Sequence, residues 1–165
     1  MGLEEHRFVR LPDLKEAGDI GLKFEGLPST YIPVRNPIFY SLAASFAEEI
    51  GAAYLVGGHN QDDMRVFRDT KGDFFKKLEA MLRASSRSLE QHRLRIMRPL
   101  QSLTKPQVIR LAESLGVPLE LTWSCHRGGT TPCWKCEGCR GRTLSFERAG
   151  MTDPLMGVDA QRKVS

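Results

Sequence analysis

The sequence has no apolar run long enough to cross a membrane, and it begins without the apolar core of a secretory signal. Its first twenty residues, MGLEEHRFVRLPDLKEAGDI, carry charged side chains throughout. A signal peptide needs an apolar stretch of about 7–15 residues and a membrane helix about 20. Internal repeats and low-complexity segments are also missing, which excludes repeat architectures. These absences favour a cytoplasmic protein with no membrane partner.

Cysteine is scarce and confined to one short stretch. The four cysteines among the 165 residues are Cys125, Cys133, Cys136 and Cys139, spaced C-x7-C-x2-C-x2-C. Four thiolates complete the shell of tetrahedral zinc, and a C-x2-C step lets two sulfurs reach one ion from a tight turn. Thiols stay reduced in the cytoplasm. The pattern therefore favours structural zinc over two disulfides, free thiols or an iron–sulfur cluster.

Positive charge is in slight excess and is dispersed along the chain. The net charge of +4 permits contact with nucleic acid or nucleotides without requiring it. A basic connector could form a partner face or a plain solvated surface; its residues are Arg83, Arg87, His92, Arg93 and Arg95. Aromatic residues do not interleave with the basic ones, so a zinc module that binds nucleic acid is only an alternative hypothesis.

Segments typical of strands and helices alternate along the first half. The stretch 7–11 suits a strand, and a long loop follows it. A helix is predicted over 37–50, with Asn36 as its cap, Pro37 at its first position and Gly51 after its end. Its apolar stripe contains Ile38, Phe39, Leu42, Ala43, Phe46 and Ile50. The run AAYLVGG at 52–58 is typical of a parallel strand buried on both faces.

The second half continues the alternation. A helix is expected over 70–83, and its inward residues are Phe74, Phe75, Leu78, Met81 and Leu82. A strand is expected over 94–100, then a helix with a Thr104–Gln107 capping box that stops at Gly116. A last helix covers about 139–149. This order predicts a parallel α/β sheet with a zinc-binding appendage near the carboxyl end.

Three features in this order resemble the 7-cyano-7-deazaguanine synthases. They are YIPVRNPIFYSLAASFAEEIGAAYLVGGHNQDD at 31–63, PLQSLTKPQVIRLAESLGVPLELTWSC at 99–125, and the cysteine pattern. That family belongs to the PP-loop ATP pyrophosphatases of queuosine and archaeosine biosynthesis. The resemblance covers about residues 7–155. It implies a Rossmann-like parallel sheet of the adenine nucleotide alpha hydrolase type over 1–120, a helical zinc lobe with four cysteine ligands over 121–155, and a tail over 156–165.

The resemblance also implies a reaction, namely conversion of 7-carboxy-7-deazaguanine to the nitrile with ATP and ammonia. A carboxylate is a poor electrophile, so adenylation gives it a leaving group. Ammonia then forms an amide, and a second activation dehydrates the amide. Magnesium would offset charge on the phosphates, and zinc would be structural. A homodimer with no nucleic-acid partner is expected.

One feature of the family is missing from this sequence. The family has a first strand followed by a Ser-Gly-Gly-x-Asp-Ser loop that cradles the ATP phosphates, whereas the Gly-Gly pairs in LVGGHN and HRGGTTP lack the flanking residues. The first strands of the sheet are therefore expected to be absent. Three explanations stay open: a P-loop segment on a separate chain, an inactive relative that acts as a subunit, or a start codon assigned too late.

The resemblance further implies substrate-binding residues, which are Arg35, Asn36, Asn60, Asp62, Asp63 and Asp69. Carboxylates accept hydrogen bonds from the N1–H and the amine of a guanine-like edge, which suits a deazapurine. The alternatives are a helix cap, a surface arginine and a solvated acidic loop. Arg68 stands where the family often has proline, which leaves the role of Asp69 open. No catalytic residue is assigned.

Overall fold

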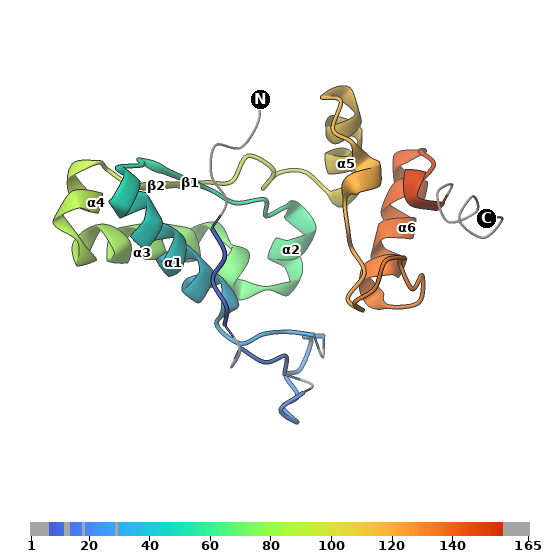
Figure 1. The fold of residues 1–165 in the computed structure, drawn as a ribbon, viewed down its shortest axis with the longest axis horizontal. Coiled ribbons are helices and arrows are strands. Elements are labelled where there is room, and N and C mark those ends of the chain that lie inside the picture. The colour runs from blue at the N-terminus through green and yellow to red at the C-terminus, as the bar shows by residue number, and fades with distance from the viewer. Residues whose placement is uncertain (1–6, 12–13, 18, 29, 157–165) are drawn as a thin grey trace. The chain divides into compact units, whose positions relative to one another are not determined.

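The computed structural model describes residues 7–11, 14–17, 19–28 and 30–156 (Figure 1). The chain divides into two compact units. Unit 1 contains residues 1–56 and 64–97, and unit 2 contains residues 57–63 and 98–165. No helix in the described ranges is long and apolar enough to cross a membrane. The domain division at residue 120 stays a prediction, and nearly all of the predicted tail lies outside the described residues.

Unit 1 is built on a small parallel sheet, as the alternation of strands and helices predicts. Strand β1 (Tyr54–Val56) pairs in parallel with β2 (Arg95–Met97), so that Leu55 lies opposite Ile96. The helices are α1 (Arg35–Ile50), the 3-10 helix η1 (Arg68–Thr70), α3 (Gly72–Ser85) and α4 (Arg87–Gln91). Helices α1, α3 and α4 gather on one side of the strand pair (Figure 1).

The core of unit 1 lies between these helices and the sheet. Its buried residues are Tyr40, Ala44, Ala47, Phe75, Leu78, Leu82, Leu89, Leu94 and Ile96. The rings of Tyr40 and Phe75 meet edge to face with centroids 5.2 Å apart, a favourable aromatic geometry. The core thus joins α1 and α3 beneath the strand pair.

The inward face of α1 differs from the predicted stripe. The helix buries Asn36, Tyr40, Ala44 and Ala47, whereas Phe39 and Ile50 are exposed. Several faces of α1 carry apolar residues, so periodicity alone cannot select the one that meets the core. The inward orientation predicted for Met81 on α3 is also wrong, because this side chain is exposed.

The predicted cap of α1 is also wrong. The helix begins at Arg35, two residues earlier than expected, and Val34 precedes it in a left-handed conformation with a φ of 58°. Asn36 therefore lies inside the first turn, and its side chain donates to the carbonyl of Asp69 at 3.2 Å. The predicted stop at Gly51 is confirmed, since its φ of 68° is a conformation that glycine adopts without strain.

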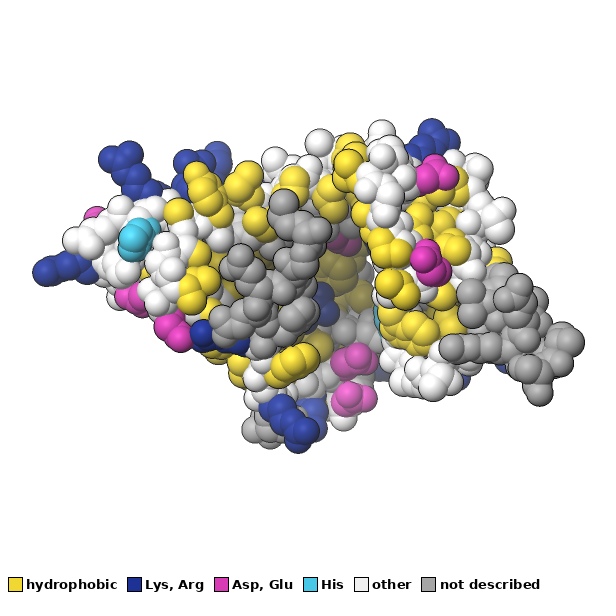
Figure 2. All heavy atoms as spheres, turned by 45° about the horizontal axis from the view of Figure 1, so that its top comes forward, with side chains coloured by type: hydrophobic (Ala, Val, Ile, Leu, Met, Phe, Trp, Pro, Cys, Tyr) yellow, Lys and Arg dark blue, Asp and Glu magenta, His cyan; other side chains and the backbone are white. Residues whose placement is uncertain are grey.

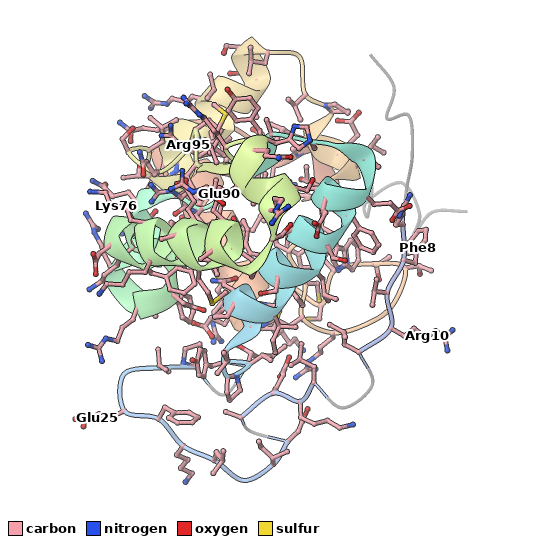
Figure 3. All side chains as sticks on the ribbon, turned by 90° about the vertical axis from the view of Figure 1, so that its left-hand side faces the viewer. Phe8, Arg10, Glu25, Lys76, Glu90 and Arg95 are labelled. Carbon is pink, nitrogen blue, oxygen red and sulfur yellow. The ribbon has the colours of Figure 1, made fainter. Side chains whose placement is uncertain are left out.

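One strand prediction is wrong, and a second is correct only in part. Residues 7–11 form no strand, and the side chains of Phe8 and Arg10 extend away from the segment that carries them (Figure 3). Strand β1 exists but is not buried on both faces, because Tyr54 is 60% exposed and Val56 is 69% exposed. Within unit 1, helices α1, α3 and α4 lie on one side of the strand pair (Figure 1).

Unit 2 contains α5 (Lys105–Ser114), the 3-10 helix η2 (Leu119–Leu121) and α6 (Glu137–Ala149). Helix α2 (Gln61–Val66) begins in unit 2 and ends in unit 1. The predicted capping box is confirmed, since the Thr104 amide donates to Gln107 Oε1 at 2.8 Å. Helices α5 and α6 pack together, and the side chain of Arg110 donates to the carbonyl of Ala149.

Candidate functional site

The four cysteine side chains of unit 2 converge on one point. All four Sγ atoms lie within 4.8 Å of one another. The Cys133 and Cys139 sulfurs are 3.9 Å apart, and those of Cys125 and Cys136 are 4.0 Å apart. A tetrahedral ion with bonds of about 2.3 Å to four sulfurs would place the sulfurs about 3.8 Å apart. The cluster could therefore bind a metal ion such as zinc.

Backbone amides converge on the same sulfurs. The Cys136 amide donates to the Cys133 sulfur at 3.3 Å, across a turn in which Trp134 has a φ of 56°. Cys136 is itself the N-cap of α6, and its sulfur accepts from the amides of Cys139 and His126. Amide donors and a helix N-terminus both stabilise negative charge. The fold thus prepares thiolates rather than thiols at these positions.

The titration of the metal-free cluster is uneven. Amide hydrogen bonds from His126 and Cys139 lower the pKa of Cys136 to about 6. The amides of Lys135 and Cys136 lower the pKa of Cys133. Burial raises the pKa of Cys139 to about 12. A proton therefore stays on Cys139 at neutral pH until a metal ion displaces it.

This pattern predicts how metal affinity depends on pH. Cys139 remains protonated across the neutral range, so binding must release at least one proton and affinity should rise by at least about tenfold per pH unit between about pH 6.5 and 8.5. Below about pH 6 Cys136 is protonated as well, so the slope should steepen. Competition with a chromophoric chelator at several pH values measures this slope. A pH-independent affinity would contradict the proton count.

A close approach of two chain segments holds the cluster together. A methyl group at Gly138 would lie 2.0 Å from the carbonyl oxygen of Ser124 and 2.8 Å from Nε2 of His126. Only glycine lets the first turn of α6, which carries Cys139, meet the segment that carries Cys125. The role of Gly138 is therefore steric, because its φ is not in the left-handed region.

Replacing Gly138 by alanine should force these two segments apart. Overpacking of this kind costs roughly 1–3 kcal/mol or more of unfolding free energy, and metal affinity should fall as the sulfurs separate. Gly141→Ala is the matched control, since a methyl group there meets nothing within 4 Å and alanine favours a helix. Thermal unfolding and zinc titration measure both effects. Equal behaviour of the two variants would show that the close approach has no energetic consequence.

A buried arginine braces the same unit, and the sequence analysis missed it. Arg142 on α6 donates to both carboxylate oxygens of Asp153, from Nε at 2.6 Å and from Nη2 at 2.8 Å. The two side chains are 6% and 1% exposed. Sequence proximity to the cysteines marks Arg142 only as a nearby positive charge, and no local pattern points to Asp153.

The remaining donors of Arg142 hold the segment that leads to Cys125. Nη1 donates to the carbonyl oxygen and to Oγ1 of Thr122, and Nη2 donates to the carbonyl of Leu119. The guanidinium also lies over the ring of Phe146, 5.0 Å from its centroid. Arg142 thereby fixes the path of the chain three residues before the first cysteine.

The predicted substrate-binding residues of unit 2 are Asn60, Asp62 and Asp63. They form one turn, which we call the capped turn. Asn60 Oδ1 accepts from the amides of Asp62 and Asp63, and Asp63 Oδ2 accepts from the amide of Asn60. Asp62 Oδ2 accepts from the amide of Lys105 at the start of α5. Lys105 Nζ lies 4.0 Å from Asp63 Oδ1. These side chains are brought together, and they cap α2 and α5 rather than forming a merely solvated loop.

The other predicted substrate-binding residues belong to unit 1. Asn36 is buried and binds the backbone of Asp69, so two of the three are in direct contact. Arg35 occupies the first position of α1, directly after Val34. A positive φ is a strained conformation for a β-branched residue such as Val34, and such strain clusters at functional sites. The substrate-binding role of Arg35, Asn36 and Asp69 stays a prediction.

Comparison with known proteins shows one family. The sequence model of the family described as "Queuosine biosynthesis protein QueC" matches residues 10–150. A protein of Trichodesmium erythraeum named 7-cyano-7-deazaguanine synthase is 37% identical over 145 residues, which is 87% of this chain and 65% of that protein. Proteins of the same name from Thermoplasma acidophilum and Nitratiruptor are 40% and 39% identical, over 79% of this chain and 55% and 58% of their own lengths.

The relatives are longer than the part of them that this chain matches. The match takes up most of this chain, which spans about 55–65% of the length of these relatives. It includes the four cysteines, the capped turn and the start of α1, all of which fall within residues 10–150. The relatives thus carry a further third or more of their length with no counterpart here.

Proposed function

The chain belongs to the QueC family of queuosine biosynthesis proteins, and from this premise we propose that it is the zinc-bearing part of a nitrile-forming ligase. Its substrate is 7-carboxy-7-deazaguanine, which the ligase converts to the nitrile with ATP and ammonia. A separate chain with a phosphate-binding loop completes the enzyme. The observation that carries the proposal is the family match over residues 10–150, which includes a cysteine cluster with the spacing of a tetrahedral metal site.

The residues of the capped turn suit recognition of the flat heterocycle. Asp62 accepts from the backbone amide of Lys105, and Asp63 accepts from that of Asn60 and lies 4.0 Å from Lys105 Nζ. A carboxylate has about four acceptor positions, so one that accepts a backbone amide can also accept the N–H groups of a guanine-like edge. Asn36 holds the backbone of Asp69 and thereby orients a third carboxylate. These residues bind and orient the substrate, and none of them is assigned a chemical step.

Zinc has a structural role in this proposal. Four protein sulfurs complete its shell and leave no open position for substrate. The ion ties the first turn of α6 to the segment that carries Cys125. ATP activates the carboxylate for attack by ammonia, with AMP as the leaving group, and a second ATP activates the amide oxygen, which leaves with AMP to give the nitrile; magnesium would offset charge on the phosphates. Residues for ATP and magnesium belong mainly to the completing chain.

The relatives carry a third or more of their length in addition to the matched part, and the sequence given contains no Ser-Gly-Gly-x-Asp-Ser loop. A homodimer of the completed enzyme is part of the proposal.

Reconstitution tests this function. The part of the Trichodesmium erythraeum relative that has no counterpart in this chain can be produced as a separate polypeptide, hereafter the complement. The chain, the complement, ATP, Mg²⁺, ammonia and 7-carboxy-7-deazaguanine should together yield the nitrile, detected by mass spectrometry, with AMP and pyrophosphate. Omission of either polypeptide should abolish the product. Failure of the full mixture to form amide or nitrile would contradict the proposal.

A further inference from the structure

Two aromatic rings of unit 1 lie nearly parallel to each other. The rings of Tyr31 and Phe67 are inclined by only 13°, and their centroids are 6.2 Å apart. Tyr31 comes shortly before Arg35, the first residue of α1, and Phe67 directly precedes η1. We call Tyr31 and Phe67 the ring pair. It brings together two segments that are distant in the sequence.

Hydrogen bonds anchor both residues of the ring pair. The carbonyl of Tyr31 accepts from the amide of Ala17 at 2.7 Å, and Ala17 is buried. The carbonyl of Phe67 accepts from the hydroxyl of Thr70 at 2.8 Å, and Thr70 is buried as well. The ring of Phe24 meets that of Tyr31 nearly at right angles, with centroids 5.5 Å apart. The orientation of the two parallel rings is therefore supported from several sides.

The ring pair lies outside the core of unit 1. Among the described residues, neither ring belongs to the core cluster or to the hydrophobic side chains packed against it, and both are only partly buried. Hydrophobic side chains reach the surface in several places on the face drawn in Figure 2, and exposure of single ones is normal. Two anchored parallel rings differ from these, because they offer flat apolar surface in a fixed orientation.

Polar groups suited to a heterocycle lie close to the ring pair along the chain. Asp69 follows Phe67 by two residues, and the side chain of buried Asn36 donates to its carbonyl at 3.2 Å. The carboxylate of Asp69 can accept from the N–H groups of a guanine-like edge. Small-molecule sites usually combine aromatic surface with a few oriented polar groups. The ring pair and Asp69 provide both kinds of contact within one unit.

We propose that the ring pair stacks on the bicyclic ring of the deazapurine and so selects a flat heterocycle, with Asp69 at its guanine-like edge. This inference rests on the proposed function and deepens it, since it names residues that recognise the faces of the substrate. Stacking recognises the ring system whatever group is attached to it. The carboxylate, the amide and the nitrile share that ring system, so one contact can hold the molecule through both activations.

Ligand binding to the full chain, with and without the complement and in the absence of ATP, tests the ring pair. The ligands are 7-carboxy-7-deazaguanine and 7-deazaguanine, which have the same ring system. Loss of an aromatic side chain that stacks on a base weakens binding roughly 5- to 150-fold. Phe67→Leu and Tyr31→Leu should each weaken binding of both ligands at least fivefold, whereas Tyr31→Phe, which keeps the ring, should change it less than twofold.

Phe39→Leu is the matched control for these substitutions. Phe39 is 46% exposed and lies on α1, so its replacement should change binding less than twofold. Circular dichroism and zinc content verify that each variant is folded. In the reconstituted reaction, Phe67→Leu should raise KM and release more of the amide intermediate before the nitrile forms. A purely structural role of Phe67 would lower the amount of active enzyme without changing the ratio of amide to nitrile.

The outcomes separate the ring pair from the proposed function. No binding of either ligand at about 1 mM would overturn the ring pair, as would wild-type binding by Phe67→Leu and Tyr31→Leu. A loss confined to the carboxylated ligand would also overturn it, because stacking does not depend on the carboxylate. Product formation in any of these cases would leave the proposed function standing. Binding that depends on the ring pair, without amide or nitrile in the full mixture, would support the ring pair and refute the ligase.

Discussion

Cys136→Ser is expected to weaken zinc binding so that a competing chelator removes the ion from the variant but leaves it on the wild-type chain. Cys136 contributes one of the four converging sulfurs, and a serine oxygen is a poor ligand for zinc in a thiolate site. Structural zinc contributes apparent binding free energies of about 10–16 kcal/mol in small zinc domains, so losing one ligand should weaken binding by roughly 100-fold or more. The melting temperature of unit 2 should fall accordingly, and elemental analysis after the chelator treatment, with thermal unfolding, measures both.

The serine substitution distinguishes the loss of a metal ligand from the loss of the helix cap. Cys136 is the N-cap of α6, and serine is a favourable N-cap, so the cap should survive in Cys136→Ser and be lost in Cys136→Ala. His126→Ala is the control, because His126 contributes an amide but no side-chain ligand to the cluster. It should retain full zinc after the same treatment. A Cys136→Ser protein with unchanged zinc content after chelation and an unchanged melting temperature would refute the metal site.

Asp153→Ala should be the most destabilising change away from the cysteines. It leaves the buried guanidinium of Arg142 without its carboxylate, and breaking a buried pair from one side costs about 3–5 kcal/mol. The amide of Leu155 also loses its acceptor, Asp153 Oδ1. Because Arg142 holds Thr122, the loss should loosen the segment before Cys125 and lower metal affinity as well. Urea unfolding monitored in unit 2, together with zinc competition, measures both effects.

Two comparisons test whether the destabilisation expected of Asp153→Ala comes from the buried ion pair with Arg142. Asp73→Ala removes an exposed carboxylate that pairs with Lys77 at 2.8 Å, and such surface pairs contribute little, so its unfolding curve should match the wild type. The double variant Arg142→Met, Asp153→Leu should be more stable than Asp153→Ala, since no charge is then left buried and unpaired. If Asp153→Ala and Asp73→Ala are equally mild, the pair does not brace unit 2.

The elements predicted correctly from sequence are those governed by local chemistry. The Thr104–Gln107 capping box and the glycine after α1 depend on residues within one turn, and both are present. The convergence of the cysteines could also be predicted from their spacing, because a C-x2-C turn brings two sulfurs together over three residues. The parallel sheet was predicted on a different ground, because a helical crossover between two strands pairs them in parallel.

What could not be predicted depends on contacts between distant residues. Asn36 looked like a cap, but its partner is the backbone of Asp69. The pairing of Arg142 with Asp153 leaves no periodic signal, and the steric role of Gly138 depends on the approach of Ser124. The inward face of α1 was mistaken because more than one face is apolar, and only the positions of α3 and the strands decide which is buried.

The most direct test of the account is the metal environment of freshly purified, reduced protein. X-ray absorption at the zinc edge, with elemental analysis of the same sample, should give one zinc per chain surrounded by four sulfur atoms at about 2.3 Å. A sample with no bound metal, or a first shell in which nitrogen or oxygen replaces sulfur, would contradict the site on which the proposed function is built.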